Sequence, residues 1–342
     1  MAPGAPSSQQ DSSEVTALIP VFNDWETVQL LLMQLDEACA KADLRLRVVL
    51  VNDGSTAPIP VPFFSAPPSR FTRVDLLDLN LNLGHQRALC VGLVYLQQHT
   101  PDNGVVLLMD ADGEDSPWDI PALLAEYRRH GGTKIVFAAR GRRAERFTFR
   151  MFYQLYRSVH WLLVGFDIRI GNFSVLPVPL LRRLTCSADL WNHYAAAVIK
   201  TRMPMSTVPL NREKRLSGKS QMNFVSLVTH GLSAMSVYSQ VIGVRLMMTT
   251  LALMVASILA LVGVAMLFFD RTNGVPIWTV ATAGFLIMLL LQTLILSLFF
   301  TFGILSDRSI QPFIPVRDCP LFVSGIHPLY PATERYSVST PQ

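Results

Sequence analysis

Apolar residues follow two patterns along this chain. In residues 14–220, short apolar runs alternate with stretches of helical periodicity. The runs are almost continuously apolar, as are strands that helices cover on both faces. The expected strands read EVTALIPV, RLRVVLVND, RVDLLDLN, GVVLLMD and KIVFAAR, and the expected helices cover 25–42, 84–99 and 117–131. This alternation predicts an α/β domain with a doubly wound, mostly parallel sheet.

The second pattern lies near the C-terminus, where residues 246–269 and 277–305 contain no charged side chain. About 20 apolar residues suffice to cross a bilayer. The short connection between the two segments predicts an antiparallel transmembrane hairpin. Arginines flank the pair at Arg245, Arg308 and Arg317, against one, Arg271, in the connection. The positive-inside bias then places the N-terminal domain and the C-terminal tail in the cytoplasm.

These patterns divide the chain into five parts. Residues 1–13 are expected to be a disordered tail, because they are polar and lack the apolar run of a signal peptide. An α/β domain (14–220), a juxtamembrane amphipathic helix (221–245), two transmembrane helices (246–305) and a cytoplasmic tail (306–342) follow. The expected location is therefore the inner (plasma) membrane, with a multi-pass topology.

Composition supports a membrane protein. Half of the 342 residues are apolar (50%), and the mean hydropathy is +0.34, too high for a soluble enzyme of this length. The net charge of +4 is mild, so no nucleic-acid partner is expected. The four cysteines have no metal-like spacing and fit a reducing compartment without structural disulfides.

Carboxylates follow directly after one of the apolar runs, in the sequence LMDADGEDSP (108–117). In a doubly wound sheet the ligand site lies beyond the carboxyl ends of the strands. Carboxylates at that place can hold a divalent cation through their oxygens. For Asp115 a second interpretation stays open, since an Asp before Pro117 can cap the helix expected at 117–131.

Five segments together resemble the family 2 glycosyltransferases that act on polyprenyl phosphates, such as dolichol-phosphate mannose synthases and bactoprenol-phosphate glucosyltransferases. The segments are IPVFNDWETV (19–28), VVLVNDGSTAP (48–58), NLNLGHQRAL (80–89), LMDADGEDSP (108–117) and IRIGNFSVL (168–176). With the hairpin, the resemblance covers roughly 14–310. It implies a GT-A fold, a nucleotide-sugar donor, a lipid phosphate acceptor in the membrane and an inverting reaction.

The resemblance also implies roles for the residues at the strand ends. Asp53 would contact the nucleotide, and Asp110 would hold its ribose or support the metal shell. Asp112, and Glu114 where the family often has Gln, would bind Mg²⁺ or Mn²⁺, so Asp110 and Asp112 are the expected catalytic pair. The remaining nucleotide candidates are Asn23, Asp24, Gly54 and Ser55. Alternatives stay open: Gly54 and Ser55 can simply turn the chain, and Asp24 can cap helix 25–42.

Cationic side chains are expected to hold the donor and acceptor phosphates, because the chain has no glycine-rich phosphate loop. The candidates are His85, Arg140, Arg212, Arg215 and Lys219. Six arginines interleave with aromatic residues between Arg140 and Arg157, and 146–166 is expected to be an amphipathic helix in the membrane interface. The competing interpretations are a structural histidine and ordinary solvated basic surfaces.

Two positions depart from the family pattern. Gln221 stands where Lys is usual, and Asn172 stands where many relatives have an Asp. Asn cannot take a proton, which matters for a hydroxyl acceptor but not for a phosphate oxygen that is already anionic. The alternatives are a hydroxyl lipid acceptor, with Asp167, His193 or Asp115 as base, or a non-catalytic nucleotide-sugar-binding subunit. The sugar, the nucleobase and the formation of a homo-oligomer are left open.

Overall fold

The protein was analysed as a computed structural model, which describes residues 15–140, 158–166, 170–211, 213, 215–217, 224–268, 277–309 and 312–331. The chain forms two compact units. The first comprises described residues within 1–146, 168–237 and 313–342, and the second those within 147–167 and 238–312. The first unit is therefore built from segments on both sides of the long apolar helices.

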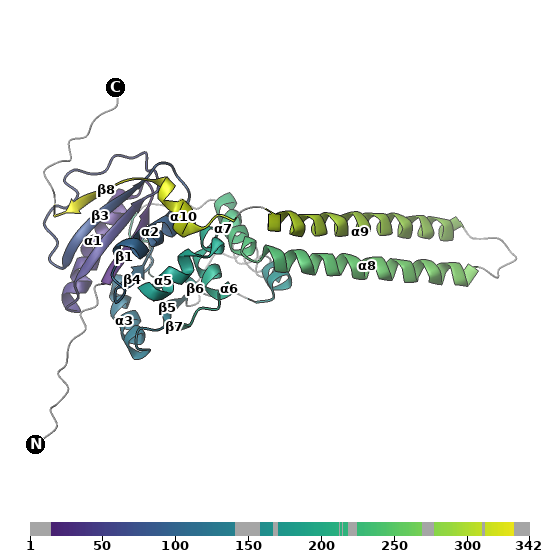
Figure 1. The fold of residues 1–342 in the computed structure, drawn as a ribbon, viewed down its shortest axis with the longest axis horizontal. Coiled ribbons are helices and arrows are strands. Elements are labelled where there is room, and N and C mark those ends of the chain that lie inside the picture. Colours follow the sequence, from purple (N-terminus) through teal and green to yellow (C-terminus); the bar gives the residue numbers. More distant parts are fainter. Residues whose placement is uncertain are drawn as a thin grey trace, which may run out of the picture. The chain divides into compact units, whose positions relative to one another are not determined.

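An eight-stranded sheet organises the first unit, in the order β7-β5-β6-β4-β1-β2-β3-β8 (Figure 1). The strands are β1 (Val15–Val21), β2 (Leu46–Asn52), β3 (Phe71–Leu79), β4 (Val105–Leu108), β5 (Ile135–Arg140), β6 (Ile170–Pro177), β7 (Met205–Leu210) and β8 (Val323–Tyr330). The central strands β4, β1, β2 and β3 are parallel, whereas β6 and β8 are antiparallel to their neighbours. This confirms the predicted α/β fold with a mostly parallel sheet.

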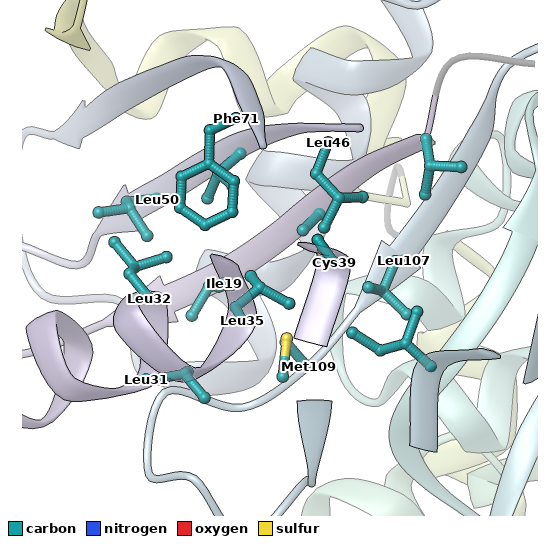
Figure 2. Close-up of a cluster of buried hydrophobic side chains, with 14 of the residues drawn as sticks. Ile19, Leu31, Leu32, Leu35, Cys39, Leu46, Leu50, Phe71, Leu107 and Met109 are labelled. Atoms are coloured by element: carbon teal, nitrogen blue, oxygen red, sulfur yellow. The ribbon is translucent and has the colours of Figure 1, made fainter. Parts of the chain in front are cut away.

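Helices α1 (Trp25–Lys41) and α3 (Ile120–Arg129) cover one face of the sheet. On α1 the buried side chains recur every three or four residues, which makes one apolar stripe. Figure 2 shows Leu31, Leu35 and Cys39 of this stripe beside Ile19 and Leu50 of the strands. The 3₁₀ turn η1 (Pro117–Asp119) leads into α3, so the helix expected at 117–131 begins at Ile120.

Helices α2 (His85–His99), α5 (Val178–Thr185) and α6 (Tyr194–Lys200) cover the other face, together with the turn η2 (Ala188–Trp191). Alternate residues of the central strands point to the two cores: Leu50 lies in the first, whereas Val49 and Val51 lie in the second. Both faces of these strands are thus buried, which is why their sequences read as continuous apolar runs.

Residues 312–331 differ from the expected C-terminal tail. They form α10 (Pro315–Asp318), η3 (Cys319–Phe322) and β8, which pairs antiparallel with β3. Without β8, the backbone N–H and C=O groups along the outer edge of β3 would lack these strand partners. The ring of Phe313 stacks on Trp191 with centroids 4.1 Å apart. Residues 313–331 therefore complete the first unit by adding β8 to the edge of its sheet.

The second unit contains the long apolar helices α8 (Ser239–Phe268) and α9 (Ile277–Ser309), which pack along each other (Figure 1). Windows of 28 residues (Ser239–Met266) and 26 residues (Trp278–Gly303) are long and apolar enough to span a membrane, and only 11% and 6% of them are buried. Helix α7 (Phe224–Ser236) precedes α8 and belongs to the first unit. Of the amphipathic helix expected at 146–166, residues 158–166 are described, and 158–164 of these are helical.

The contact between Phe313 and Trp191 yields a stability prediction. Phe313→Ala removes a stacked, partly buried ring, and we expect the free energy of unfolding of the first unit to fall by about 1–3 kcal/mol. Leu321→Ala is the matched control, because this side chain in the same segment is 77% exposed. Thermal unfolding in detergent measures both. Equal effects of the two substitutions would show that the aromatic contact does not hold the C-terminal segment.

Thiol reactivity tests the burial of the cysteines. Cys39, Cys90 and Cys319 are buried and Cys186 is exposed. Burial, together with the charge of Asp36, raises the pKa of Cys39 to about 12 against the opposing charge of Arg70. At pH 8 we expect one thiol of the folded protein to react rapidly with a disulfide reagent and four after denaturation. Rapid labelling of the Cys186→Ser variant would contradict this arrangement.

Candidate active site

The loops after β1 and β2 are joined to each other where those parallel strands end. Asn23 lies in the left-handed region with φ 55°, and its side-chain Oδ1 accepts hydrogen bonds from the backbone N–H of Thr56 and Ala57, both at 2.8 Å. The N–H of Asn23 donates to Ser55 Oγ at 2.9 Å. These hydrogen bonds therefore hold the loop after β1 against the loop after β2, and both loops contain candidate nucleotide residues.

Asp53 is the next candidate, and it is only 3% exposed. Its two carboxylate oxygens accept the backbone N–H groups of Leu83, at 2.7 Å, and Gly84, at 2.9 Å. Burial raises the pKa of Asp53, while these hydrogen bonds and the charge of His85 act in the opposite direction. Asp53 thus anchors the loop that precedes α2.

Gly54 lies where two loops approach closely. It has φ 65°, and a Cβ at this position would lie 2.6 Å from the backbone nitrogen of Asn82. Only glycine fits both the conformation and the space. Gly54 therefore turns the chain, as one of the two interpretations expected. The same turn places the end of β2 against the loop at Asn82.

Asp110 forms a polar cluster with His85 and Asn172. His85 Nε2 lies 3.2 Å from Asp110 Oδ1, and Asn172 Nδ2 lies 3.1 Å from the same oxygen and 2.8 Å from His85 Nε2. Burial disfavours the charged imidazole, but the hydrogen bond and charge of Asp110, with the charges of Asp112 and Asp53, outweigh it and raise the pKa of His85. Three segments far apart in the sequence meet here.

Gln86 is a site residue that the sequence analysis did not single out. Its side chain is 8% exposed, donates to Asn172 Oδ1 at 3.1 Å and accepts from the backbone N–H of Tyr194 at 2.9 Å. Its place directly after His85 is the only signal in the sequence, and a glutamine at a helix start is too common to be informative.

Asp112 and Asp24 share one cation, Arg215. An Arg215 nitrogen, Nη2, pairs with Asp24 Oδ2, and Nη1 lies 3.8 Å from Asp112 Oδ2. The other oxygen of Asp24 accepts from the Thr27 hydroxyl at 2.5 Å, so Asp24 also supports the first turn of α1. Arg215 therefore neutralises carboxylates from two strand ends.

The segment around Arg215 is fastened to the carboxylate loop through the backbone. The N–H of Leu216 donates to the carbonyl of Asp112 at 3.1 Å, and that of Glu213 donates to the carbonyl of Glu114 at 3.0 Å. Gly113 has φ 76°, and the Leu216 side chain fills the space that a Cβ of Gly113 would need. The carboxylate loop thus packs together with residues 213 and 215–217.

A small, open cleft lies next to this element. Its polar lining is Glu114, Asp115, Ser116, Asp119 and Asn211. Burial and the charge of Glu213 raise the pKa of Asp119. Asp115 accepts from the backbone N–H of Asp110 at 3.0 Å, and Ser116 occupies the N-cap position of η1, without a side-chain capping bond. Asp115 therefore shapes the carboxylate loop instead of capping the following helix.

The other candidates lie elsewhere or outside the described residues. Arg140 is the last residue of β5, paired with Leu210 of β7. Arg212, Lys219 and Gln221 fall outside the described residues. His193 caps α6, since its ring nitrogen accepts from the N–H of Ala196 at 3.4 Å.

Comparison with known proteins identifies the domain. Residues 16–179 match the model of the family described as glycosyl transferase family 2. The segment is a family 2 glycosyltransferase domain. It contains the central strands β1–β4 and the described site residues from Asn23 to Asn172, so the resemblance seen in the motifs is confirmed for this part of the chain.

Individual relatives are distant. Undecaprenyl-phosphate 4-deoxy-4-formamido-L-arabinose transferase of Erwinia tasmaniensis is 27% identical over 117 residues, 34% of this chain and 34% of that protein. The similarity thus spans about a third of that transferase. An uncharacterized glycosyltransferase of Synechocystis sp. is 22% identical over 231 residues, 66% of this chain and 70% of that protein. Among solved structures, mannosyl-3-phosphoglycerate synthase from Rubrobacter xylanophilus superposes with a TM-score of 0.45 and 18% identity over 67% of this chain and 73% of that chain.

The packing of the family 2 domain at Gly113 gives a testable prediction. Gly113→Ala combines an unfavourable positive φ with a clash against Leu216, and we expect it to lower nucleotide affinity and to cost about 1–3 kcal/mol of stability. Gly131→Ala is the control, since φ is 60° there and nothing lies within 4 Å of the added Cβ.

Calorimetry and nucleotide titration separate the two contributions. The control measures the backbone cost alone, and the second substitution Leu216→Ala in the Gly113→Ala variant should restore part of the affinity. If both glycine variants bind nucleotide equally well, the contact between Gly113 and Leu216 does not shape the site.

Proposed function

We propose that this protein is a membrane-bound, metal-dependent, inverting glycosyltransferase that moves a hexose from a UDP- or GDP-sugar to a polyprenyl phosphate. The observation that carries the proposal is the convergence of Asp24 and Asp112, which share Arg215, at the carboxyl ends of β1 and β4 in a family 2 domain. Such strand ends are where open α/β sheets bind their ligands.

The donor would bind along this edge. Asp110 and Asp53 are the proposed nucleotide residues, and Asn23, Asp24, Gly54 and Ser55 form the rim around them. Asp53 already holds the loop at Leu83 and Gly84, so its contribution to nucleotide binding includes the placement of that loop. Arg215 is the proposed ligand of the diphosphate, because guanidinium groups bind phosphate in a bidentate manner.

The residues fit a divalent cation of the Mg²⁺ or Mn²⁺ type. No three His, Cys, Asp or Glu side chains within the described part of the chain form a ready cage. Mg²⁺ does not need one, since it is commonly held by one or two carboxylates, water and substrate phosphates. Asp112, whose side chain is 23% exposed, and Glu114 would supply the carboxylates. The ion would neutralise the departing nucleoside diphosphate.

The acceptor proposal rests on Asn172. Where a carboxylate could serve as a base, this chain has an amide that is held between Gln86 and Asp110. A phosphate oxygen needs no base, because it is anionic at neutral pH. It would form a bond to the anomeric carbon as the bond from that carbon to the diphosphate breaks, which inverts the configuration and leaves no proton to transfer.

A lipid acceptor agrees with the apolar helices. α8 and α9 have the length and composition of membrane spans, and the Erwinia relative is named as an undecaprenyl-phosphate transferase. We infer a multi-pass protein of the inner membrane with its catalytic domain in the cytoplasm. The candidates for binding the acceptor phosphate remain Arg140, Arg212 and Lys219. The candidate on the donor side is His85, which would bind a phosphate of the nucleotide sugar.

A turnover screen tests the proposal. The full-length protein in detergent would receive Mn²⁺ or Mg²⁺ with UDP-glucose or GDP-mannose, and either undecaprenyl phosphate or diacylglycerol. We expect nucleotide release only with the lipid phosphate, a product of inverted anomeric configuration by NMR, and a loss of at least about 10- to 100-fold in Asp112→Asn, as is typical when a metal site is disturbed. Glu37→Gln, on the exposed side of α1, is the control and should match the wild type.

Each other outcome has a definite meaning. Release only with diacylglycerol would overturn the phosphate acceptor and require a base elsewhere. Metal-dependent nucleotide binding without turnover on any acceptor would favour a binding subunit over an enzyme. Full activity after Asp112→Asn, or in the presence of a chelator, would overturn the proposed metal dependence.

A further inference from the structure

We propose that Gln86 and Asn172 are positioning residues that orient Asp110 through a fixed chain of hydrogen bonds starting at the backbone of Tyr194. The chain comprises the N–H of Tyr194, the amide of Gln86 and the amide of Asn172, and we call it the amide relay. The inference rests on the proposed function only in taking Asp110 as a nucleotide-binding residue.

The direction of the amide relay follows from its first member. A backbone N–H can only donate, so the Gln86 atom that lies 2.9 Å from the Tyr194 nitrogen is the carbonyl Oε1. The amide nitrogen of Gln86 is then turned toward Asn172. Because that nitrogen can only donate, the atom of Asn172 at 3.1 Å is its oxygen, Oδ1.

Asn172, the last member of the amide relay, directs a hydrogen-bond donor at Asp110. With its oxygen held by Gln86, Asn172 presents Nδ2 to Asp110 Oδ1 at 3.1 Å. The reversed amide would place an oxygen against a carboxylate oxygen, which is repulsive. The orientation of a side-chain amide is usually ambiguous, but here the Tyr194 N–H determines it for both amides. The backbone N–H of Tyr194 in α6 thus determines which atom of Asn172 contacts Asp110.

Burial strengthens these bonds. Asn172 is 6% exposed, Gln86 8% and Tyr194 0%, so water competes little for the amides. Tyr194 is itself held, because its hydroxyl lies 2.9 Å from Ser174 Oγ. The Asp110 side chain, by contrast, is 17% exposed at the strand edge. The amide relay therefore connects a rigid core to a carboxylate that faces the site.

The alternative is a purely structural role, in which both amides only satisfy buried polar groups. The two roles differ in how the effects of substitutions combine. If Gln86 acts on nucleotide binding through Asn172, removing Gln86 has no further effect on binding once Asn172 no longer offers a donor. Its effect on stability, which comes from the unpaired Tyr194 N–H, persists in both backgrounds.

A double-mutant cycle makes this comparison with Gln86→Met and Asn172→Leu, which keep roughly the size of each side chain but remove its hydrogen-bond donor. The full-length protein in detergent is titrated with Mn²⁺ and UDP or GDP, whichever the wild type binds, and its thermal unfolding is recorded. We expect Asn172→Leu to weaken nucleotide binding about 10- to 100-fold, as for a lost hydrogen bond to a charged group. Gln86→Met should weaken it about 3- to 10-fold alone and less than twofold when added to Asn172→Leu.

Gln98→Met is the matched control, because Gln98 lies on the exposed side of the same helix, and it should leave binding and unfolding unchanged. Wild-type affinity in Asn172→Leu would overturn the amide relay, as would an equal cost of Gln86→Met in both backgrounds. Failure of the wild type to bind either nucleotide with Mn²⁺ would instead overturn the proposed function.

Discussion

The parallel pairing of β4, β1 and β2 places acidic residues from three segments at one edge of the sheet. Val21 of β1 lies opposite Asn52 of β2, and Leu18 lies opposite Leu108 of β4, so the loops that follow these strands meet. Carboxylates that converge in this way repel one another unless donors or cations lie among them. Many of the polar contacts in this domain supply those donors and cations.

The carboxylates are held by partners of three kinds. Backbone N–H groups hold Asp53, an amide and an imidazole contact Asp110, and the guanidinium of Arg215 lies between Asp24 and Asp112. Backbone and amide donors are fixed in place, whereas Arg215 sits on a long side chain. The groups proposed to hold the nucleotide are therefore fixed by backbone and amide donors, whereas Arg215, proposed to meet the diphosphate, is held by two carboxylates and by its Nε–H bond to the carbonyl of Ser217.

The described elements also show how the site accommodates an amide at position 172, where the motif resemblance leads one to expect a carboxylate. An aspartate there would add a further negative charge within reach of Asp110. The amide instead supplies donors to a neighbouring carboxylate, and Gln86 supports it from behind. The departure thus agrees with an acceptor that needs no deprotonation, and it ties α2, β6 and α6 to the same carboxylate.

The sequence by itself determined the parts of this protein that depend on local pattern. Continuous apolar runs gave the central strands, because those strands are buried on both faces, and uncharged segments gave α8 and α9. The carboxylates after β4 could be recognised as a site because strand ends bear ligands in such sheets. Only the tertiary structure decided that β8 returns to the edge of β3, that Arg215 lies between Asp24 and Asp112, and that Gln86 supports Asn172. These contacts join residues up to 256 positions apart, as between Val74 of β3 and Tyr330 of β8, and no periodicity or motif encodes which distant partner a side chain meets.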